Sequence, residues 1–183
     1  IAMVLDLMHA SAVRDAEPVG LVTTGGTGSI LHALIAYRED ASIRRGITTP
    51  NIVKPETGHP AFDKGCHLFG IECRTVPVDP ATTLVEPSSM AEAIDENTIA
   101  LVGSAGNYPY GTIDPINDLG ALALDRGVGL HVDACLRAFL STHDQVEDRD
   151  ALDRLLVADL HRPLASATQD QRCQGRARCS RII

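Results

Sequence analysis

The fold of this chain is decided by residues 98–135, which have the sequence TIALVGSAGNYPYGTIDPINDLGALALDRGVGLHVDAC. Residues 98–106 begin as an apolar run that is typical of a buried strand and end in a turn. Residues 116–125 repeat apolar side chains at helical spacing, and Gly127 is well placed to end that helix. Residues 129–135 form a second apolar run. This order predicts a βαβ unit, whose two strands lie parallel in one sheet.

The same alternation continues toward the N-terminus. We expect three further strands, at residues 19–24, 51–55 and 71–78. We expect helices at residues 1–10, 30–40, 59–69 and 88–94, and another at 151–158, although the pattern weakens beyond residue 140. The chain is therefore predicted to have an α/β fold, with a mostly parallel central sheet and flanking helices.

The composition is that of a globular protein with an acidic surface. Hydrophobic residues make up 44% of the 183 residues, which is enough for a core. The net charge of -8 and the pI of about 5.2 argue against binding to nucleic acid. No apolar run approaches the ~20 residues of a membrane-spanning helix, and no signal-peptide pattern opens the chain. We expect a cytoplasmic protein without a membrane segment.

The five cysteines show no CxxC pair and no compact disulfide framework. We expect Cys66, Cys73 and Cys135, which lie in apolar surroundings, to be reduced core residues. The spacing of the cysteines and histidines is unlike that of a zinc site, so no metal is predicted.

Residues 25–29, GGTGS, separate an expected strand from an expected helix. Bare glycine amides, the hydroxyls of Thr27 and Ser29 and the positive end of a helix dipole can together cradle a phosphate. The lysine of a P-loop and the third glycine of the dinucleotide fingerprint are missing. A hydroxyl-capped turn without a ligand and a nucleotide-binding α/β module are the alternatives.

Asp133 lies at the carboxyl end of the last apolar run, where a buried carboxylate needs a partner. A protonated heterocyclic nitrogen, as in pyridoxal phosphate chemistry, is one such partner, and a helix cap or a metal are the others. His131 is expected to pack within the strand. Ser104 follows another strand at the edge where open α/β sheets bind ligands. His59 begins a helix, where capping or a surface position is the simpler explanation.

Four segments, taken in order, resemble the pyridoxal phosphate (PLP)-dependent group II decarboxylases, and within them the sphingosine-1-phosphate lyases. The segments are TTGGTGSILHALIAYRE (23–39), TPNIVKPETGHPAFDKGCHLFGIECRTVPVD (49–79), LVGSAGNYPYGTIDPI (101–116) and LHVDACLRAFL (130–140). The resemblance implies that residues 1–140 are part of the PLP-binding large domain of a fold-type-I enzyme. Residues 141–183 are then a degenerate or foreign C-terminal tail.

The resemblance also implies roles for individual residues. The residues expected to hold the PLP phosphate are Gly26, Thr27, Gly28 and Ser29. His59 would stack on one face of the pyridine ring, and Ala134 would pack near the other. Ser104 would approach the phenolic oxygen of the ring, and Asp133 would pair with its nitrogen.

The sequence departs from the family at three places, one of which is Arg137-Ala138, where the sphingosine-1-phosphate lyases have two glycines. Gly28 stands where the family usually has a glutamate. The Schiff-base lysine is absent, because the nearest likeness to its segment is ADLHRP (158–163), which has Arg162 instead. An arginine stays protonated and cannot form a Schiff base. Lys54 and Lys64 belong to other segments, so we expect this chain to be an inactive fragment.

The function implied for the parent enzyme is that of a PLP-dependent carbon–carbon lyase. It would cleave a phosphorylated sphingoid base, a small-molecule amine, and would work as a homodimer. An amino-acid decarboxylase of the same family is one alternative. A non-catalytic remnant that at most binds PLP is the other.

Overall fold

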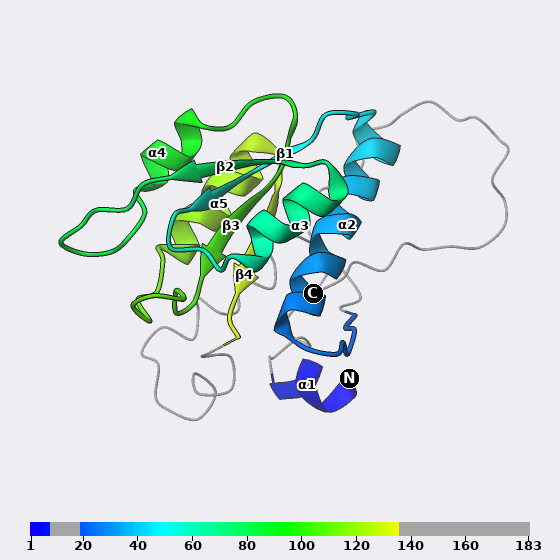
Figure 1. Cartoon of the computed structure of the whole chain (residues 1–183), viewed down its shortest axis with the longest axis horizontal. Helices are drawn as coiled ribbons and strands as arrows, with labels where there is room; N and C mark the ends of the chain where they lie inside the picture. The colour runs from blue at the N-terminus through cyan, green and yellow to red at the C-terminus, as the bar shows by residue number, and fades with distance from the viewer. Residues whose placement is uncertain (8–18, 136–183) are drawn as a thin grey trace, which may run out of the picture.

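The computed structural model of the chain describes residues 1–7 and 19–135 (Figure 1). The strands are β1 (Asn51–Pro55), β2 (Glu72–Val76), β3 (Thr98–Ser104) and β4 (Gly129–Asp133). The helices are α1 (Ala2–Leu7), α2 (Gly26–Arg45), α3 (Ala61–Phe69), α4 (Pro87–Glu92) and α5 (Ile116–Arg126). The four strands form one parallel sheet in the order β2-β1-β3-β4, so the predicted α/β class is confirmed.

The βαβ unit that the sequence predicts is formed by β3, α5 and β4. β3 and β4 are neighbours in the sheet, with Leu101 opposite Leu130 and Ser104 opposite Asp133. α5 ends at Arg126, and Gly127 accepts the left-handed conformation that closes it, with a φ of 64°. This unit places the carboxyl ends of two strands side by side.

The sheet is covered on both faces, which explains why its inner strands are continuous apolar runs. One core cluster includes Ile52 and Phe62 and packs β1 against α2 and α3. The other includes Val53 and Leu119 and packs the opposite face against α4 and α5. Because side chains alternate along a strand, neighbours such as Ile52 and Val53 belong to different clusters.

The strand expected at residues 19–24 is wrong. This segment is irregular apart from a single bridging residue, Val19, and the side chains of Leu21 and Val22 are 52% and 76% exposed. An apolar run gains the free energy of a strand only when a neighbouring strand or helix covers it. Nothing among the described residues covers these two side chains.

Other expected boundaries shift by a few residues. α2 begins inside the glycine-rich turn at Gly26 and continues to Arg45, past the expected end at residue 40, because buried Ala41 extends its apolar face. β2 ends at Val76, before Pro77, which has no amide hydrogen for the sheet. Of the helix expected at 1–10, residues 2–7 are helical, and the helix expected at 151–158 lies outside the described residues.

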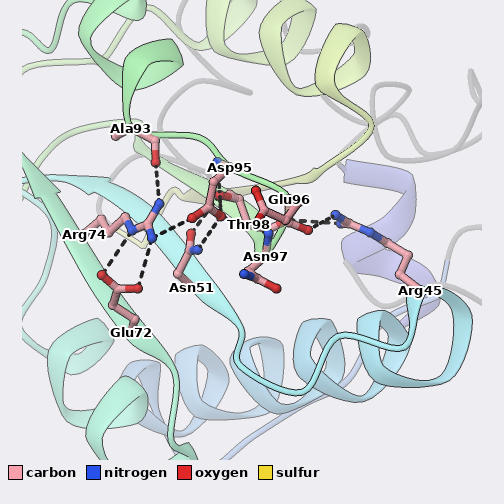
Figure 2. Close-up of polar contacts among 9 residues, drawn as sticks. All are labelled: Arg45, Asn51, Glu72, Arg74, Ala93, Asp95, Glu96, Asn97 and Thr98. Atoms are coloured by element: carbon pink, nitrogen blue, oxygen red, sulfur yellow. Dashed lines mark hydrogen bonds and ion pairs between the residues drawn. The ribbon is translucent and has the colours of Figure 1, made fainter.

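A polar network lies beside the amino-terminal ends of β1 and β3 (Figure 2). Asp95 accepts a hydrogen bond of 2.7 Å from the Asn51 amide and forms a 2.7 Å ion pair with Arg74. Thr98 donates a 2.8 Å hydrogen bond to Asn51. The bond from Asn51, supported by Arg74, lowers the pKa of Asp95 to about 2. The network ties β1, β2 and β3 together at the edge opposite the carboxyl ends.

No helix among residues 1–7 and 19–135 is long and apolar enough to cross a membrane.

Candidate functional site

The predicted site residues surround the carboxyl-terminal edge of the sheet. Ser104 ends β3, Asp133 ends the adjacent β4, and His59 follows β1. Gly26 begins α2, and a Cβ atom added to it would lie 3.6 Å from Cys135 Sγ, just past Asp133. The start of α2 and the end of β4 are therefore in contact. Parallel α/β sheets bind their ligands at this edge.

Asp133 is held by its backbone and has few side-chain partners. Its carbonyl oxygen accepts a 2.9 Å hydrogen bond from the Ala105 amide, which fixes the end of β4 against β3. Its carboxylate accepts a 3.2 Å hydrogen bond from the Cys135 amide. No lysine or arginine within the described ranges forms an ion pair with this partly exposed carboxylate. It therefore has acceptor capacity for a cationic ligand.

His131 packs as the sequence suggests. Its ring lies edge-on to Phe62, with centroids 5.3 Å apart, and to Tyr37, at 6.4 Å. Burial lowers the pKa of His131, although the nearby Asp133 charge opposes the shift. His131 is therefore a neutral side chain that packs on the face of the sheet covered by α2 and α3.

Ser104 is almost completely buried, with 1% of its surface exposed, and its hydroxyl has no hydrogen-bond partner within the described residues. Its amide donates a 2.8 Å hydrogen bond to the Asp114 carboxylate, and its carbonyl accepts a 2.9 Å bond from the Asp114 amide. An unpaired buried hydroxyl costs free energy that a ligand oxygen can recover. The backbone of Ser104 is fixed, whereas its buried hydroxyl has no protein partner among the described residues.

Asp114 is a site residue that the sequence analysis missed. It is 2% exposed, and burial raises its pKa. Asp114 lies in the loop that follows β3. Its carboxylate accepts a hydrogen bond from the Ser104 amide, and its own amide donates one to the Ser104 carbonyl. The only signal in the sequence is an aspartate in the apolar-flanked turn GTIDP, which does not indicate that its carboxylate folds back onto the strand.

The glycine-rich turn has the geometry of an anion cradle. Gly25 has a φ of 150°, which side chains rarely adopt, and α2 begins directly after it. The amides of Gly26, Thr27 and Gly28 are in the first turn and have no acceptor within the helix. The Ser29 hydroxyl lies 2.6 Å from the Thr23 hydroxyl. The exposed start of a helix of 20 residues therefore offers amides and hydroxyls to an anion.

His59 has both a capping role and an open ring. Its Nδ1 accepts a 3.0 Å hydrogen bond from the Ala61 amide at the start of α3. Its partly exposed ring meets Tyr108 edge-on, with centroids 4.8 Å apart. Thr57, two residues earlier, is 3% exposed and its hydroxyl has no partner among the described residues. Thr57 was not predicted, because its position depends on how two loops fold together.

Cys135 corrects one expectation from the sequence. Cys66 is buried and Cys73 partly buried, as expected of core residues, but Cys135 is exposed beside the start of α2. Desolvation of the sulfur and the neighbouring Asp133 raise the pKa of its thiol to about 11. Cys135 is therefore a neutral thiol at the rim of the site.

A model of the pyridoxal-dependent decarboxylase conserved domain matches residues 1–149. The chain belongs to this family. The sphingosine-1-phosphate lyase of Drosophila melanogaster is 48% identical over 140 residues, which cover 76% of this chain and 25% of the relative. That of Saccharomyces cerevisiae is 41% identical over 140 residues, which cover 76% and 23%. The chain thus spans about a quarter of the length of these curated relatives.

Two solved structures show the same fold over about a third of their own length. A sphingosine-1-phosphate lyase from Burkholderia pseudomallei matches with a TM-score of 0.71 and 46% identity, over 75% of this chain and 32% of that one. The apo form of mouse CSAD matches with a TM-score of 0.69 over 84% of this chain and 35% of that one. At 20% identity, the second likeness supports the fold alone.

The pyridoxal-dependent decarboxylase family implies pyridoxal 5′-phosphate as the cofactor. The described residues fit this group chemically. The start of α2 offers donors for a phosphate, the Asp133 carboxylate has room for a cationic nitrogen, and the buried Ser104 hydroxyl is unpaired. All three lie at one edge of the sheet.

Proposed function

We propose that this chain is part of the cofactor-binding domain of a PLP-dependent carbon–carbon lyase that acts on a phosphorylated sphingoid base. The reaction would break the bond between Cα and Cβ of the substrate and give an aldehyde and phosphoethanolamine. The observation that carries the proposal is the pairing of Ser104 with Asp133 at the carboxyl edge, beside the start of α2. Identities of 41% to 48% with sphingosine-1-phosphate lyases support the substrate class.

The start of α2 binds the phosphate in this proposal. The residues involved are Gly26, Thr27, Gly28 and Ser29. Amide donors and the helix dipole stabilise a dianion, and glycine at two of these positions lets the phosphate approach the backbone. Gly26 lies beside Cys135, so the start of α2 and the end of β4 are neighbours at the same edge of the sheet.

The remaining predicted residues orient the ring. Asp133 would hold the protonated ring nitrogen, and Ser104 would donate its unpaired hydroxyl to the phenolic oxygen. His59, whose Nδ1 accepts a hydrogen bond from the start of α3, would pack against one face of the ring, and Ala134 against the other. Bound in this way, the cofactor supplies an electron sink for cleavage of a bond at the substrate Cα.

We propose that the chain itself binds PLP without a covalent bond and is inactive. Its two lysines are Lys54 and Lys64. The Lys54 ammonium lies 3.3 Å from the Asp63 carboxylate on α3, and Lys64 is an exposed residue of the same helix. Arg162, in the segment that resembles the lysine segment, lies outside the described residues. Without a Schiff-base lysine, the site resembles a non-catalytic remnant.

A PLP titration of the purified full chain tests this proposal. We expect reversible binding that leaves no borohydride-reducible adduct on any lysine. Asp133→Asn should weaken binding by roughly tenfold or more, because a charge-assisted hydrogen bond contributes about 1.5–3 kcal/mol. The matched control is Asp118→Asn, which changes an exposed carboxylate on α5. A reducible adduct on Lys54 or Lys64, or tighter binding of a dinucleotide than of PLP, would contradict the proposal.

The amino-acid decarboxylases of the same family remain the second candidate for the substrate. Structures matching at 20% to 24% identity show that these enzymes share the fold. At this identity they do not indicate the substrate of this chain. The sphingosine-1-phosphate lyases match at about twice that identity, which supports the sphingoid substrate.

A further inference from the structure

Thr83 has a backbone conformation that threonine rarely adopts. It lies in the loop between β2 and α4 and has a φ of 60°, the only positive φ of a non-glycine residue in the described part of the chain. Its amide donates a 2.7 Å hydrogen bond to the Asp79 carbonyl, which closes the loop. A branched side chain is strained in this conformation, whereas a glycine would close the loop without strain. Strained residues of this kind are held by their surroundings and gather at functional sites.

The surroundings that hold Thr83 belong to the loop that follows β3, residues 105–113. The Thr83 hydroxyl lies 2.7 Å from the Thr112 hydroxyl, and the Thr83 carbonyl accepts a 3.3 Å hydrogen bond from the Asn107 side chain. Asn107 and Thr112 are paired with each other, because the Asn107 amide donates a 2.7 Å bond to the Thr112 carbonyl. Thr83 therefore binds both sides of the base of loop 105–113.

Loop 105–113 presents an aromatic ring to His59. Asn107 is completely buried, and its side chain accepts a 3.0 Å hydrogen bond from the Tyr110 amide. The next residue, Tyr108, is 62% exposed, and its ring meets the His59 ring edge-on with centroids 4.8 Å apart. The residue that Thr83 holds is thus the direct neighbour of the residue that contacts His59.

The loops that follow β1, β2 and β3 form one connected unit. Because β1 lies between β2 and β3 in the sheet, the contact of Thr83 with loop 105–113 joins the loops on either side of β1. The loop after β1 is tied to the end of β2, since Glu56 donates a 2.9 Å bond to the Val76 carbonyl and accepts one of 2.9 Å from the Val78 amide. His59 follows in this loop, with the Ala61 amide on its Nδ1 and Tyr108 against its ring.

We propose that Thr83 is a positioning residue for His59. Thr83 fixes loop 105–113, and the Tyr108 ring then holds the His59 ring in the orientation that PLP requires. The inference rests on the proposed function for the identity of the cofactor. In it, Thr83 has no contact with PLP and acts through Asn107 and Tyr108. A ring that is already oriented loses less side-chain freedom when the cofactor binds, so the affinity is higher.

A purely structural role for Thr83 gives a different expectation. If Thr83 only closed the loop between β2 and α4, its replacement would change stability, and cofactor binding would suffer only as far as the fold did. In our proposal the two effects have different signs. Thr83→Gly relieves the backbone strain, so the melting temperature should stay the same or rise, while the binding of PLP should weaken.

The first test is proton NMR of the full chain without PLP. The chain has seven histidines, and His59→Gln identifies the ring signals of His59 by their loss. Thr83→Gly should shift these signals in the same direction as Tyr108→Leu, because both variants remove the edge-on contact. The matched control, Thr82→Gly, changes the exposed neighbouring threonine and should leave the signals in place. His59 signals that stay unchanged in Thr83→Gly or in Tyr108→Leu would overturn the proposal.

The second test combines a PLP titration with thermal melting of the same variants. Thr83→Gly should weaken PLP binding by roughly three- to tenfold, the equivalent of one edge-on aromatic contact, without a lower melting temperature. Thr83→Ser keeps the hydroxyl and should bind PLP within about twofold of the wild type. Unchanged affinity in Thr83→Gly, or a loss that follows the melting temperature in both variants, would contradict the proposal. A wild type that binds no PLP would refute the proposed function, and the NMR experiment would still decide whether Thr83 positions His59.

A double-mutant cycle tests the contact between the two hydroxyls. Thr83→Val and Thr112→Val each keep the shape of the side chain and remove the hydroxyl. Each should shift the His59 signals and weaken PLP binding, and the double variant should be no worse than either single variant, because both remove the same contact. Additive losses of affinity would show that the two hydroxyls act independently and would exclude this route from Thr83 to His59.

Discussion

Ser104 and Asp133 are register partners at the carboxyl ends of adjacent parallel strands, and they differ in how their side chains are satisfied. The Ser104 hydroxyl is buried without a partner, and the Asp133 carboxylate is partly exposed with a donor from its own turn. Neither arrangement stabilises the fold in an obvious way. Both suit a ligand that donates to Asp133 and accepts from Ser104.

Ser104→Ala should weaken PLP binding and leave the stability of the fold almost unchanged. Removing an unpaired buried hydroxyl leaves no partner unsatisfied, so the free energy of unfolding should change by less than about 1 kcal/mol. PLP binding should weaken by roughly fivefold, the equivalent of about one neutral hydrogen bond. Thermal melting and a PLP titration measure the two effects. The control is Ser88→Ala at an exposed position of α4, and a large loss of stability in Ser104→Ala would count against a ligand-directed hydroxyl.

Asp114→Ala should destabilise the site and the fold together. The substitution leaves the buried Ser104 amide without its acceptor, which costs about 1–3 kcal/mol. Urea unfolding followed by circular dichroism measures this cost. Asp114→Asn keeps an acceptor oxygen and should recover at least half of the loss, whereas equal losses in both variants would show that the negative charge is what matters.

Asp95→Asn should make the protein less stable at neutral pH and have little effect near pH 2. The folded pKa of Asp95, about 2, lies below its ordinary value of 3.8, so ionised Asp95 stabilises the fold above about pH 4. This contribution is lost as the pH falls from about 4 through 2. Because the side chain is 30% exposed, we expect on the order of 1–2 kcal/mol.

Urea unfolding of the wild type and of Asp95→Asn at pH 7, 4 and 2.5 measures this dependence. Asp125→Asn, at a carboxylate that is 78% exposed, serves as the control. A difference between wild type and Asp95→Asn that stays constant over the whole range would show that the Asp95 charge is not responsible.

Gly129→Ala should destabilise the start of β4. A Cβ atom there would collide with the Tyr37 ring, which cannot move away easily because its hydroxyl donates a 2.9 Å hydrogen bond to the Leu130 carbonyl. Overpacking of this kind costs about 1–3 kcal/mol. The penalty should shrink when Gly129→Ala is made in a Tyr37→Leu background. Additive losses in this double-mutant cycle would exclude the collision as the cause.

The sequence predicts those parts of the fold whose burial is set locally. β3 is buried at every position, so its apolar run is unambiguous, and Gly70 and Gly127 end α3 and α5 as their spacing indicates. Residues 19–24 have an equally apolar pattern and form no strand, because only tertiary contacts decide whether such a run is covered.

The residues of the candidate site also fall into those that the sequence predicts and those that it does not. Asp133 and Ser104 are predictable because a polar residue at the end of an apolar run stands out. Asp114 and Thr57 are not, because their roles depend on a loop folding back onto a strand and on a hydroxyl being enclosed.

The central claim is that Asp133 holds the protonated ring nitrogen of PLP. The most direct test compares the affinity of the full chain for PLP with its affinity for 1-deaza-PLP, in which carbon replaces that nitrogen. We predict that the wild type prefers PLP by roughly ten- to a hundredfold, the value of a charge-assisted hydrogen bond, and that Asp133→Asn removes most of the preference. An equal preference in wild type and Asp133→Asn would contradict the claim.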